Sequence, residues 1–192
     1  MAYLTETEVR GRASRITQRI QKSAYRVLTE DRAPASETFD VFLSHSSAEP
    51  EEILLGIKAI LADIGLRVYI DKYSDPQLSP DNVTVQTADI LRVRMRQSRS
   101  LLYVYSQHST KSRWMPWELG FFDGHIGRVG VLPVTRAQEE VFKGEEYLNL
   151  YPHVDRVTTK GGEEKLWINR STNEYARLYE WIKGIEEIDA HQ

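Results

Sequence analysis

LLYVY at residues 101–105 and VGVLPV at residues 129–134 are almost wholly apolar, which is typical of strands buried on both faces of a parallel sheet. FDVFLS at residues 39–44 and LRVYID at residues 66–71 have the composition of two further strands. Because strands alternate with helical periodicity, the sequence predicts the α/β class, with a flavodoxin-like, doubly wound parallel sheet. The helices between the strands are expected at residues 49–64, 83–97 and 114–124.

The N-terminal part is expected to add one amphipathic helix. Apolar side chains recur at three- and four-residue steps through residues 5–30, and Thr5 and Glu8 have the spacing of a capping box. The pattern stops before Pro34, which disfavours a helical conformation in the residue before it. We therefore divide the chain into an N-terminal helix with its linker and a main domain, at residues 1–35 and 36–192.

The C-terminal part is expected to add a hairpin and a helix. Residues 154–159 and 165–169 flank a turn that contains two glycines, which predicts a β-hairpin. A final helix is predicted from about Thr172 onward. Its inner face is expected to consist of Tyr175, Leu178, Trp181, Ile182 and Ile185.

The composition is that of a globular domain and excludes several kinds of protein. The chain has 192 residues, of which 41% are hydrophobic and 28% are charged, and its formal net charge is −3. It contains no cysteine, so disulfide scaffolds, cysteine-based zinc sites and thiol nucleophiles are excluded. No stretch approaches the roughly 20 apolar residues of a membrane span, and the N-terminus has no signal-peptide core. We expect a cytoplasmic protein without a membrane partner.

Basic residues gather locally at Arg92, Arg94, Arg96 and Arg99. On a helix, such a group more often forms a solvated face than a stripe that binds nucleic acid. The slightly negative net charge of the chain points the same way, because nucleic-acid binding favours a basic surface. No nucleic-acid partner is expected.

Familiar catalytic and metal-binding motifs are missing. The sequence has no glycine-rich phosphate loop and no Gly-x-Ser-x-Gly nucleophile elbow. Its five histidines lie far apart, at spacings that do not suit a shared metal ion. Neither a bound metal nor a true cofactor is expected.

The remaining candidates lie where strands end. Doubly wound sheets bind ligands beyond the carboxyl ends of their strands, which points to the turns at residues 44–50, 71–82 and 106–118. In the third turn, Trp114 and Glu118 are four residues apart and share one face of a helix. A tryptophan beside a carboxylate suits a flat, cationic ring. From the spacing alone, however, the commoner arrangement has the tryptophans of this turn in the core and Glu118 in solvent.

Three segments resemble a TIR domain, in particular the bacterial kind. They are FDVFLSHS at residues 39–46, VYID at residues 68–71 and the pattern Ser-x-x-Ser-x-Trp-x-x-x-Glu-Leu at residues 109–119. The resemblance covers roughly residues 39–134 in order and spacing. It implies the TIR version of the doubly wound fold. It also implies an activity, because many members of this family hydrolyse NAD+ or cyclise its ADP-ribose part.

The resemblance assigns roles to individual residues. The glutamate of the Trp-x-x-x-Glu pattern is essential in the family and corresponds here to Glu118, which is therefore the expected catalytic residue. The tryptophan one turn earlier, here Trp114, helps to form the nicotinamide pocket. Tyr73, close to Asp71, corresponds to an aromatic residue in a loop that covers the nucleotide.

Further contacts follow from position. His45 and Ser46 come directly after the first strand of the TIR-like part and are expected to approach the substrate. Trp117 either lines the same cleft or packs in the core, and the sequence leaves both open. The expected substrate contacts are His45, Ser46, Asp71, Tyr73, Ser112, Trp114 and Trp117.

Cleavage of NAD+ as a substrate needs few protein groups. Ordinary glycosidases need an acid for the leaving oxygen and a second carboxylate opposite it. Nicotinamide leaves NAD+ as a neutral molecule from a cationic ring, so no acid is required. Glu118 is expected to stabilise the oxocarbenium-like transition state. The acceptor then decides the product: water gives ADP-ribose, and an internal nucleophile gives a cyclic ADP-ribose.

Two functions are open from the sequence. The first is an NAD+ nucleosidase or ADP-ribosyl cyclase similar to the TIR component of Thoeris anti-phage defence, in which an ADP-ribose-derived signal activates a separate effector protein. The second is a non-catalytic adaptor, or a mimic of host signalling, that acts through TIR–TIR contacts. The Trp114–Glu118 pair favours the enzyme, because an adaptor need not keep it. Self-association is expected of the enzyme too, and a simple flavodoxin-like ligand binder ranks last.

Overall fold

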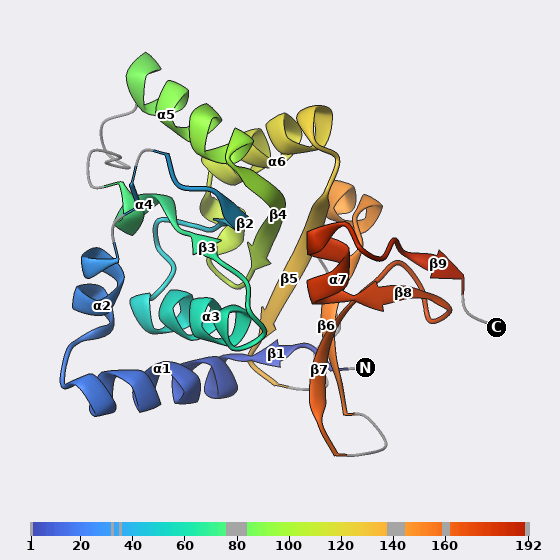
Figure 1. The fold of residues 1–192 in the computed structure, drawn as a ribbon, viewed down its shortest axis with the longest axis horizontal. Helices are drawn as coiled ribbons and strands as arrows, with labels where there is room; N and C mark the ends of the chain where they lie inside the picture. The colour runs from blue at the N-terminus through green and yellow to red at the C-terminus, as the bar shows by residue number, and fades with distance from the viewer. Residues whose placement is uncertain are drawn as a thin grey trace.

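The computed structural model describes residues 2–31, 33–34, 36–75, 84–137, 145–158 and 162–190. Its strands form one sheet in the order β3-β2-β4-β5-β6-β7-β8-β9, and β1 pairs with β5 (Figure 1). The pairs from β3 to β6 are parallel, and those from β6 to β9 are antiparallel. The strands are β1 (Leu4–Thr5), β2 (Phe39–Ser44), β3 (Val68–Tyr69), β4 (Ser98–Tyr105), β5 (Val129–Thr135), β6 (His153–Thr158), β7 (Glu164–Asn169), β8 (Glu174–Arg177) and β9 (Asp189–Ala190).

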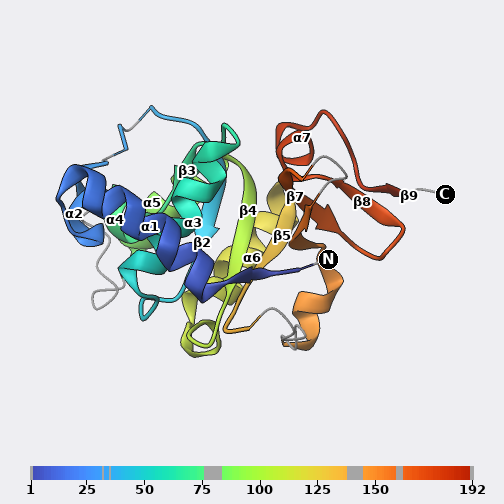
Figure 2. The same cartoon turned by 90° about the horizontal axis from the view of Figure 1, so that it is seen from below.

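Helices cover both faces of the parallel part of this sheet (Figures 1 and 2). One layer consists of α1 (Glu6–Ile20), α2 (Ala24–Glu30), α3 (Glu51–Asp63) and α7 (Leu178–Lys183). The other consists of α5 (Val85–Arg96) and α6 (Trp114–His125). The remaining helical segments are α4 (Asp71–Ser74) and the 3-10 turns η1 (Ser109–Lys111) and η2 (Glu146–Leu150).

Strand residues alternate between two hydrophobic cores. In β2, Val41 and Leu43 pack with the α3 layer, whereas Phe42 packs with the α5–α6 layer. In β4, Leu102 belongs to the first core and Leu101 to the second. Because every residue of such a strand meets one of two apolar layers, the strands read as continuous apolar runs. The predicted doubly wound α/β fold is confirmed.

The order of the strands reverses between β2 and β4. The chain passes from β2 to β3 on one side of β2 and then returns through α5 to β4 on its other side. A crevice opens at such a point, beyond the carboxyl ends of the two strands. Ser44 is the last residue of β2 and lies opposite Tyr103 of β4. A ligand site is therefore expected above Ser44.

The N-terminal segment forms two helices, so the prediction of one helix over residues 5–30 is wrong. α1 ends where Gln21 adopts a left-handed conformation with φ 51°. Ser23 then starts α2, because its side-chain oxygen accepts a hydrogen bond from the backbone N–H of Arg26. Serine at this position offers the chain a new helix start that apolar periodicity does not reveal. The capping box of Thr5 and Glu8 is confirmed.

The same segment packs closely against the rest of the chain. Its first residues form β1, a parallel neighbour of β5 that the sequence analysis missed because two residues show no periodicity. α1 lies against α3 (Figure 2). A Cβ atom on Gly56 would lie 2.1 Å from the carbonyl oxygen of Val9, so this helix crossing requires glycine.

The C-terminal hairpin is confirmed, and the helix after it is shorter than predicted. β6 and β7 are antiparallel, and residues 159–161 of their turn lie outside the described residues. Tyr175 lies in β8 rather than in a helix, because β8 pairs with β7. Gly184, with φ 71°, ends α7, which leaves Ile185 71% exposed. The predicted inner residues that are buried are Leu178, Trp181 and Ile182.

Arg94 corrects the expectation of a solvated basic face. Its side chain is 6% exposed and donates hydrogen bonds to both carboxylate oxygens of Asp75, from Nε at 2.7 Å and from Nη2 at 2.9 Å. The hydroxyl of Tyr69 donates to the same carboxylate at 2.7 Å. Two charge-assisted hydrogen bonds to one carboxylate stabilise a guanidinium in a buried position. The pair links the end of α4 to α5.

The loop predicted at residues 72–82 begins as a helix, because residues 72–74 belong to α4. Residues 76–82 of this loop lie outside the described residues.

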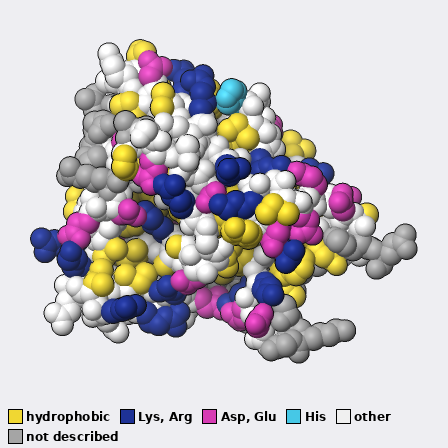
Figure 3. Space-filling model, viewed as in Figure 1, with side chains coloured by type: hydrophobic (Ala, Val, Ile, Leu, Met, Phe, Trp, Pro, Cys, Tyr) yellow, Lys and Arg dark blue, Asp and Glu magenta, His cyan; other side chains and the backbone are white. Residues whose placement is uncertain are grey.

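Acidic and basic side chains are interspersed over the face of the molecule that Figure 3 shows. In the described part of the chain, no helix has both the length and the apolar character needed to cross a membrane.

Candidate active site

Glu118 is buried beside Ser44, at the carboxyl end of β2. Along α6, Met115, Leu119 and Phe122 face the core at helical spacing, and Glu118 lies among them with 3% exposure. The Oγ of Ser44 donates a hydrogen bond of 2.6 Å to Oε2 of Glu118. Among the described residues, Oε1 has no hydrogen-bond partner. The expectation of a solvated surface acid is therefore wrong, and one carboxyl oxygen is uncommitted.

His45 and Asp71 form an ion pair near Glu118. These three side chains are called the Glu118 cluster below. Nε2 of His45 lies 2.9 Å from Oδ1 of Asp71, and Nδ1 lies 2.9 Å from the carbonyl oxygen of Ser46. A carbonyl oxygen only accepts, so Nδ1 carries a proton, and Nε2 carries one too while Asp71 is ionised. Burial alone lowers the pKa of His45, but the hydrogen bond and charge of Asp71 outweigh it and raise the pKa. Burial opposes ionisation of Asp71 as well, and His45 lowers the pKa of that carboxyl.

The electrostatics of this cluster keep Glu118 protonated. Burial, followed by the negative charge of Asp71, raises the pKa of Glu118 to about 8. The hydrogen bond from Ser44 and the positive charge of His45 act in the opposite direction and only partly offset this rise. A cation placed beside the carboxyl favours its ionised form. The site is therefore suited to a positively charged ligand, whose binding would release the proton of Glu118.

Glu118→Gln is expected to make the protein more stable at neutral and alkaline pH. The pKa of Glu118 is raised from 4.5 to about 8, so across this range the folded protein holds a proton that the unfolded chain has released. The free energy of unfolding of the wild type therefore falls as the pH rises through this window, and glutamine removes the effect. The stability of the variant relative to the wild type is expected to grow by roughly 3 kcal/mol between about pH 5 and about pH 8. Urea unfolding at several pH values measures this difference, and parallel curves for the two proteins would contradict it.

Trp114 and Trp117 contact each other on α6. Their ring centroids are 5.2 Å apart in an edge-to-face arrangement, and both side chains are only partly buried. Trp117 also stacks on Phe121 at 6.0 Å and lies under the guanidinium of Arg92 at 5.4 Å. Trp114 precedes Glu118 by one helical turn and therefore lies on the same side of α6. The role of Trp114 as a wall of the pocket stays a prediction, whereas Trp117 belongs to an aromatic row that continues along the helix.

Ser46 and Ser112 bind the backbone of their own turns. Ser46 is 2% exposed, and its Oγ accepts a hydrogen bond of 3.3 Å from the backbone N–H of Ala48. The Oγ of Ser112 accepts one of 3.3 Å from Met115 at the start of α6. Ser112 also lines a separate cavity of about 240 Å³, together with Tyr103. Both serines shape the turns that carry the site, and their hydroxyls do not bond to the Glu118 cluster.

The structure does not bring Tyr73 to Glu118. The ring is 1% exposed and packs edge-to-face against Tyr25 of α2, with ring centroids 6.1 Å apart. It belongs to the core under α3, whereas the tryptophans of α6 pack on the other core. In this structure the ring of Tyr73 faces Tyr25 of α2, and its place over a bound nucleotide stays a prediction.

Two features of the site escaped the sequence analysis. Ser44, the hydrogen-bond donor to Glu118, could have been noticed as the strand residue directly before His45. Glu49 is 4% exposed, and it accepts a hydrogen bond of 2.5 Å from the Oγ of Ser106. Burial raises the pKa of Glu49. Its carboxyl joins the turn after β2 to the turn after β4, but from the sequence it is only an acidic residue before a helix start.

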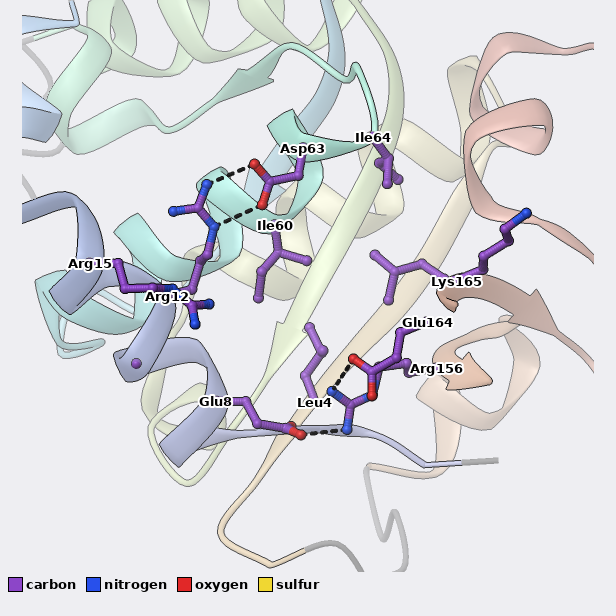
Figure 4. A pocket seen from close by; sticks show the side chains of 12 residues that line it. Leu4, Glu8, Arg12, Arg15, Ile60, Asp63, Ile64, Arg156, Glu164 and Lys165 are labelled. Carbon is purple, nitrogen blue, oxygen red and sulfur yellow. Dashed lines mark hydrogen bonds and ion pairs between the residues drawn. The ribbon is translucent and has the colours of Figure 1, made fainter. Parts of the chain in front are cut away.

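A groove of about 510 Å³ lies elsewhere, between α1, α3 and the β6–β7 hairpin (Figure 4). Two of its three arginines are already neutralised, because Arg12 binds both carboxylate oxygens of Asp63 and Arg156 pairs with Glu8 and Glu164. The groove shares no residue with the Glu118 cluster, so the chemistry rather than the volume identifies the candidate site. Over the described residues, no group of three or more His, Cys, Asp or Glu side chains could hold a metal ion.

No family model matches the chain. It is 40% identical over 150 residues to the probable 3' cyclic ADP-D-ribose synthase ThsB' of Bacillus cereus (strain MSX-D12), covering 77% of each chain. It is 31% identical over 86 residues to the putative cyclic ADP-D-ribose synthase TIR2 of Cytobacillus dafuensis, covering 44% of this chain and 22% of that protein. The TIR domain of the Toll-related receptor TRR-2 of Hydra magnipapillata aligns with a TM-score of 0.43 and 17% identity, covering 58% of this chain and 79% of that domain.

Proposed function

The chain belongs to the bacterial TIR-domain family that includes these cyclic ADP-ribose synthases, and from this membership we propose that it is an enzyme that breaks the nicotinamide–ribose bond of NAD+ at Glu118. One observation carries the assignment to Glu118. Its carboxyl is buried where the order of the strands reverses, between β2 and β4. There it accepts a hydrogen bond from Ser44 beside the His45–Asp71 pair. The raised pKa of Glu118 makes this the place where a cation is preferred.

The reaction follows from the charges of enzyme and substrate. The pyridinium ring of NAD+ is a cation, so its binding beside Glu118 lowers the pKa of the carboxyl and releases the proton. When the bond between the ribose C1 and the ring nitrogen breaks, the electron pair stays on nitrogen and neutral nicotinamide leaves. The positive charge moves to the ribose, where the buried carboxylate of Glu118 stabilises it. The reaction so proposed requires no acid, metal or cofactor.

The burial of Glu118 also favours an enzyme over an adaptor. A buried carboxyl with a raised pKa lowers the stability of the folded protein at neutral pH. A module that acts only through TIR–TIR contacts gains nothing from this cost, because the carboxyl has 3% exposure and cannot contact a partner protein. An active site does gain from it, because a group that destabilises the free protein can be stabilised by the substrate.

The direct test of this proposal is the fate of NAD+. Concentrated protein incubated with NAD+ is expected to release nicotinamide together with an equal amount of ADP-ribose or a cyclic isomer, which mass spectrometry separates. An NAD+ analogue with a carbocyclic ribose is the matched control. It lacks the ring oxygen that stabilises the cation, so we expect it to bind and inhibit but not to be cleaved. NAD+ that binds at the site and stays intact would contradict the proposal.

The pH dependence of kcat/KM is expected to report the carboxyl of Glu118. The raised pKa of about 8 means that little of the free enzyme carries the ionised form at neutral pH. Because the ionised form is the active one, kcat/KM is expected to rise about 50-fold from roughly pH 6 to roughly pH 8 and then to level off. The corresponding rise in kcat is expected at lower pH than the rise in kcat/KM, because bound NAD+ lowers the pKa of the carboxyl. Initial rates in constant-ionic-strength buffers measure both, and a kcat/KM that is flat or falls over this range would exclude ionised Glu118 as the active form.

We further propose a cyclic ADP-ribose as the product, which acts as a signal to a separate effector in Thoeris-type anti-phage defence. The name of the relative from Bacillus cereus supports the cyclic product.

We also propose self-association through TIR–TIR contacts, supported by Val85 and Val93 of α5, which are 74% and 48% exposed. A cytoplasmic location is proposed because the chain has no cysteine and its substrate is an intracellular nucleotide. Light scattering at increasing concentration tests the self-association.

A further inference from the structure

The two carboxylate oxygens of Asp71 are used unequally. Oδ1 accepts hydrogen bonds from Nε2 of His45 at 2.9 Å and from the backbone N–H of Lys72 at 2.6 Å. Oδ2 has no hydrogen-bond partner among the described residues. The side chain of Asp71 is 28% exposed, in contrast to the 3% exposure of the His45 side chain. One oxygen is therefore fixed in place, and the other is available to a ligand.

Asp71 lies at the same edge of the sheet as Glu118. β3 runs parallel to β2, with Phe42 opposite Tyr69, so Asp71 follows β3 where Ser44 ends β2. The negative charge of Asp71 is among the causes of the raised pKa of Glu118, which means that the two carboxyls interact. Besides Glu49, which is 4% exposed and bonded to Ser106, the site thus holds two carboxyls, and His45 interacts with both. The mechanism above uses only one of them.

The acceptor half of the reaction leaves a proton to be placed. When the ribose C1–nitrogen bond has broken, a hydroxyl oxygen of water or of the substrate forms the new C1–O bond and becomes an oxonium. This oxonium must lose its proton to a base. Because an oxonium is a much stronger acid than a carboxylic acid, an ordinary carboxylate is basic enough to take the proton.

On the basis of the proposed function, we propose that Oδ2 of Asp71 accepts this proton and that Asp71 is a second catalytic residue, specific for oxygen acceptors. His45 is a poor candidate, because both of its ring nitrogens are engaged, with Ser46 and with Asp71. Glu118 is required opposite the cationic ribose and is bound by Ser44. His45 is then a positioning residue, which holds Oδ1 so that Oδ2 faces the acceptor.

A nitrogen acceptor separates this step from bond cleavage. The ring nitrogen of 3-acetylpyridine attacks C1 with its lone pair and has no proton to lose, so the exchanged dinucleotide forms without a base. ADP-ribose and its cyclic isomers all require the loss of a hydroxyl proton when oxygen is the acceptor. Both branches follow the same cleavage, so the ratio of their products does not depend on how well Glu118 works.

The experiment measures this ratio in the wild type and in Asp71→Asn, with NAD+ and 3-acetylpyridine present and the products separated by mass. Asparagine keeps an oxygen for His45 but cannot take the proton. The ratio of oxygen-acceptor products to exchanged dinucleotide is expected to fall at least about tenfold, while exchange continues. Asp71→Glu retains a carboxylate and is expected to restore part of the ratio. Asp123→Asn, on α6, is the control and is expected to keep the wild-type ratio.

The outcomes separate this inference from the proposed function. An unchanged ratio in folded Asp71→Asn overturns the role of Asp71 and leaves NAD+ cleavage at Glu118 intact. If the wild type shows no nicotinamide release and no exchange, the proposed function is overturned, and the inference is overturned with it. If circular dichroism shows that Asp71→Asn is unfolded, Asp71→Ser, which also lacks a carboxylate, takes its place, and a wild-type ratio in that variant overturns the role.

Discussion

Glu118→Gln is expected to lower the rate of nicotinamide release from NAD+ by at least roughly 10²- to 10³-fold, the range found when a preorganised charge-stabilising group is removed from an active site. Glutamine keeps the shape of the side chain and can still accept the hydrogen bond that Ser44 donates at 2.6 Å. It removes only the negative charge that faces the ribose in the transition state. Glu118→Asp keeps the charge but withdraws it by one methylene, so an intermediate rate is expected. Single-turnover assays at about pH 8 measure all three proteins.

The matched control for this prediction lies on the same helix. Asp123→Asn also removes a carboxylate from α6, but this carboxylate is exposed and bonds to the hydroxyl of Tyr151 at 3.1 Å. Its rate is expected to equal that of the wild type. Loss of folding cannot explain an inactive Glu118→Gln, because that variant is expected to gain stability at this pH. Equal nicotinamide release by Glu118→Gln and the wild type would remove Glu118 from the mechanism.

Asp75→Ala is expected to destabilise the fold by roughly 3 to 5 kcal/mol, because it leaves the buried guanidinium of Arg94 without its carboxylate. The Arg94 side chain is 6% exposed and the Asp75 side chain 8%, and Nε and Nη2 of Arg94 bond to the two carboxylate oxygens. The substitution also removes the acceptor of the Tyr69 hydroxyl. Because Asp75 and Arg94 join α4 to α5 beside Asp71, a fall in NAD+ cleavage is expected as well. Urea unfolding and the nicotinamide assay measure the two effects.

An exposed pair on α5 provides the control for Asp75→Ala. Arg92 pairs with Asp89 at 2.7 Å, and their side chains are 37% and 64% exposed. Arg92→Ala is expected to cost less than about 1 kcal/mol, because solvent screens an exposed ion pair. The double variant Asp75→Ala/Arg94→Met removes the orphaned charge and is expected to recover part of the lost stability. A loss for Asp75→Ala as small as that for Arg92→Ala would mean that the buried pair does not hold α4 to α5.

The parallel sheet was predictable because its strands carry their environment in their composition. LLYVY in β4 and VGVLPV in β5 are apolar at nearly every position, because the α3 layer packs on one face of the sheet and the α5–α6 layer packs on the other. The position of the candidate site followed from the same pattern, because parallel strands with crossover helices bring their carboxyl ends together. His45, Asp71 and Glu118 were named from the strand ends and the TIR-like motifs, and the structure places them in one electrostatic cluster.

The contacts that the sequence did not reveal join residues that lie far apart along the chain. The TIR resemblance put Tyr73 in a covering loop, and Tyr25, 48 positions earlier, packs on its ring. Arg94 has the pattern of a solvated helix face, yet Asp75 and the carbonyl groups of Ala33 and Pro34 accept its hydrogen bonds. Local periodicity contains no information about either set of partners, so these contacts could not be predicted from the sequence.

By itself, the sequence determined the class of fold and the edge of the sheet where a ligand site is expected, because hydrophobic burial and helix geometry translate local composition and spacing directly into structure. The choice of Glu118 as the candidate central residue came from the resemblance of residues 109–119 to the TIR motif. Only the tertiary structure decided the ionisation of the site. The pKa of Glu118 depends on its burial beneath α6, on Ser44, and on the His45–Asp71 pair carried by two other strand ends. Electrostatic energies are set by distance and solvent exposure in space, and neither quantity is written in the order of the residues.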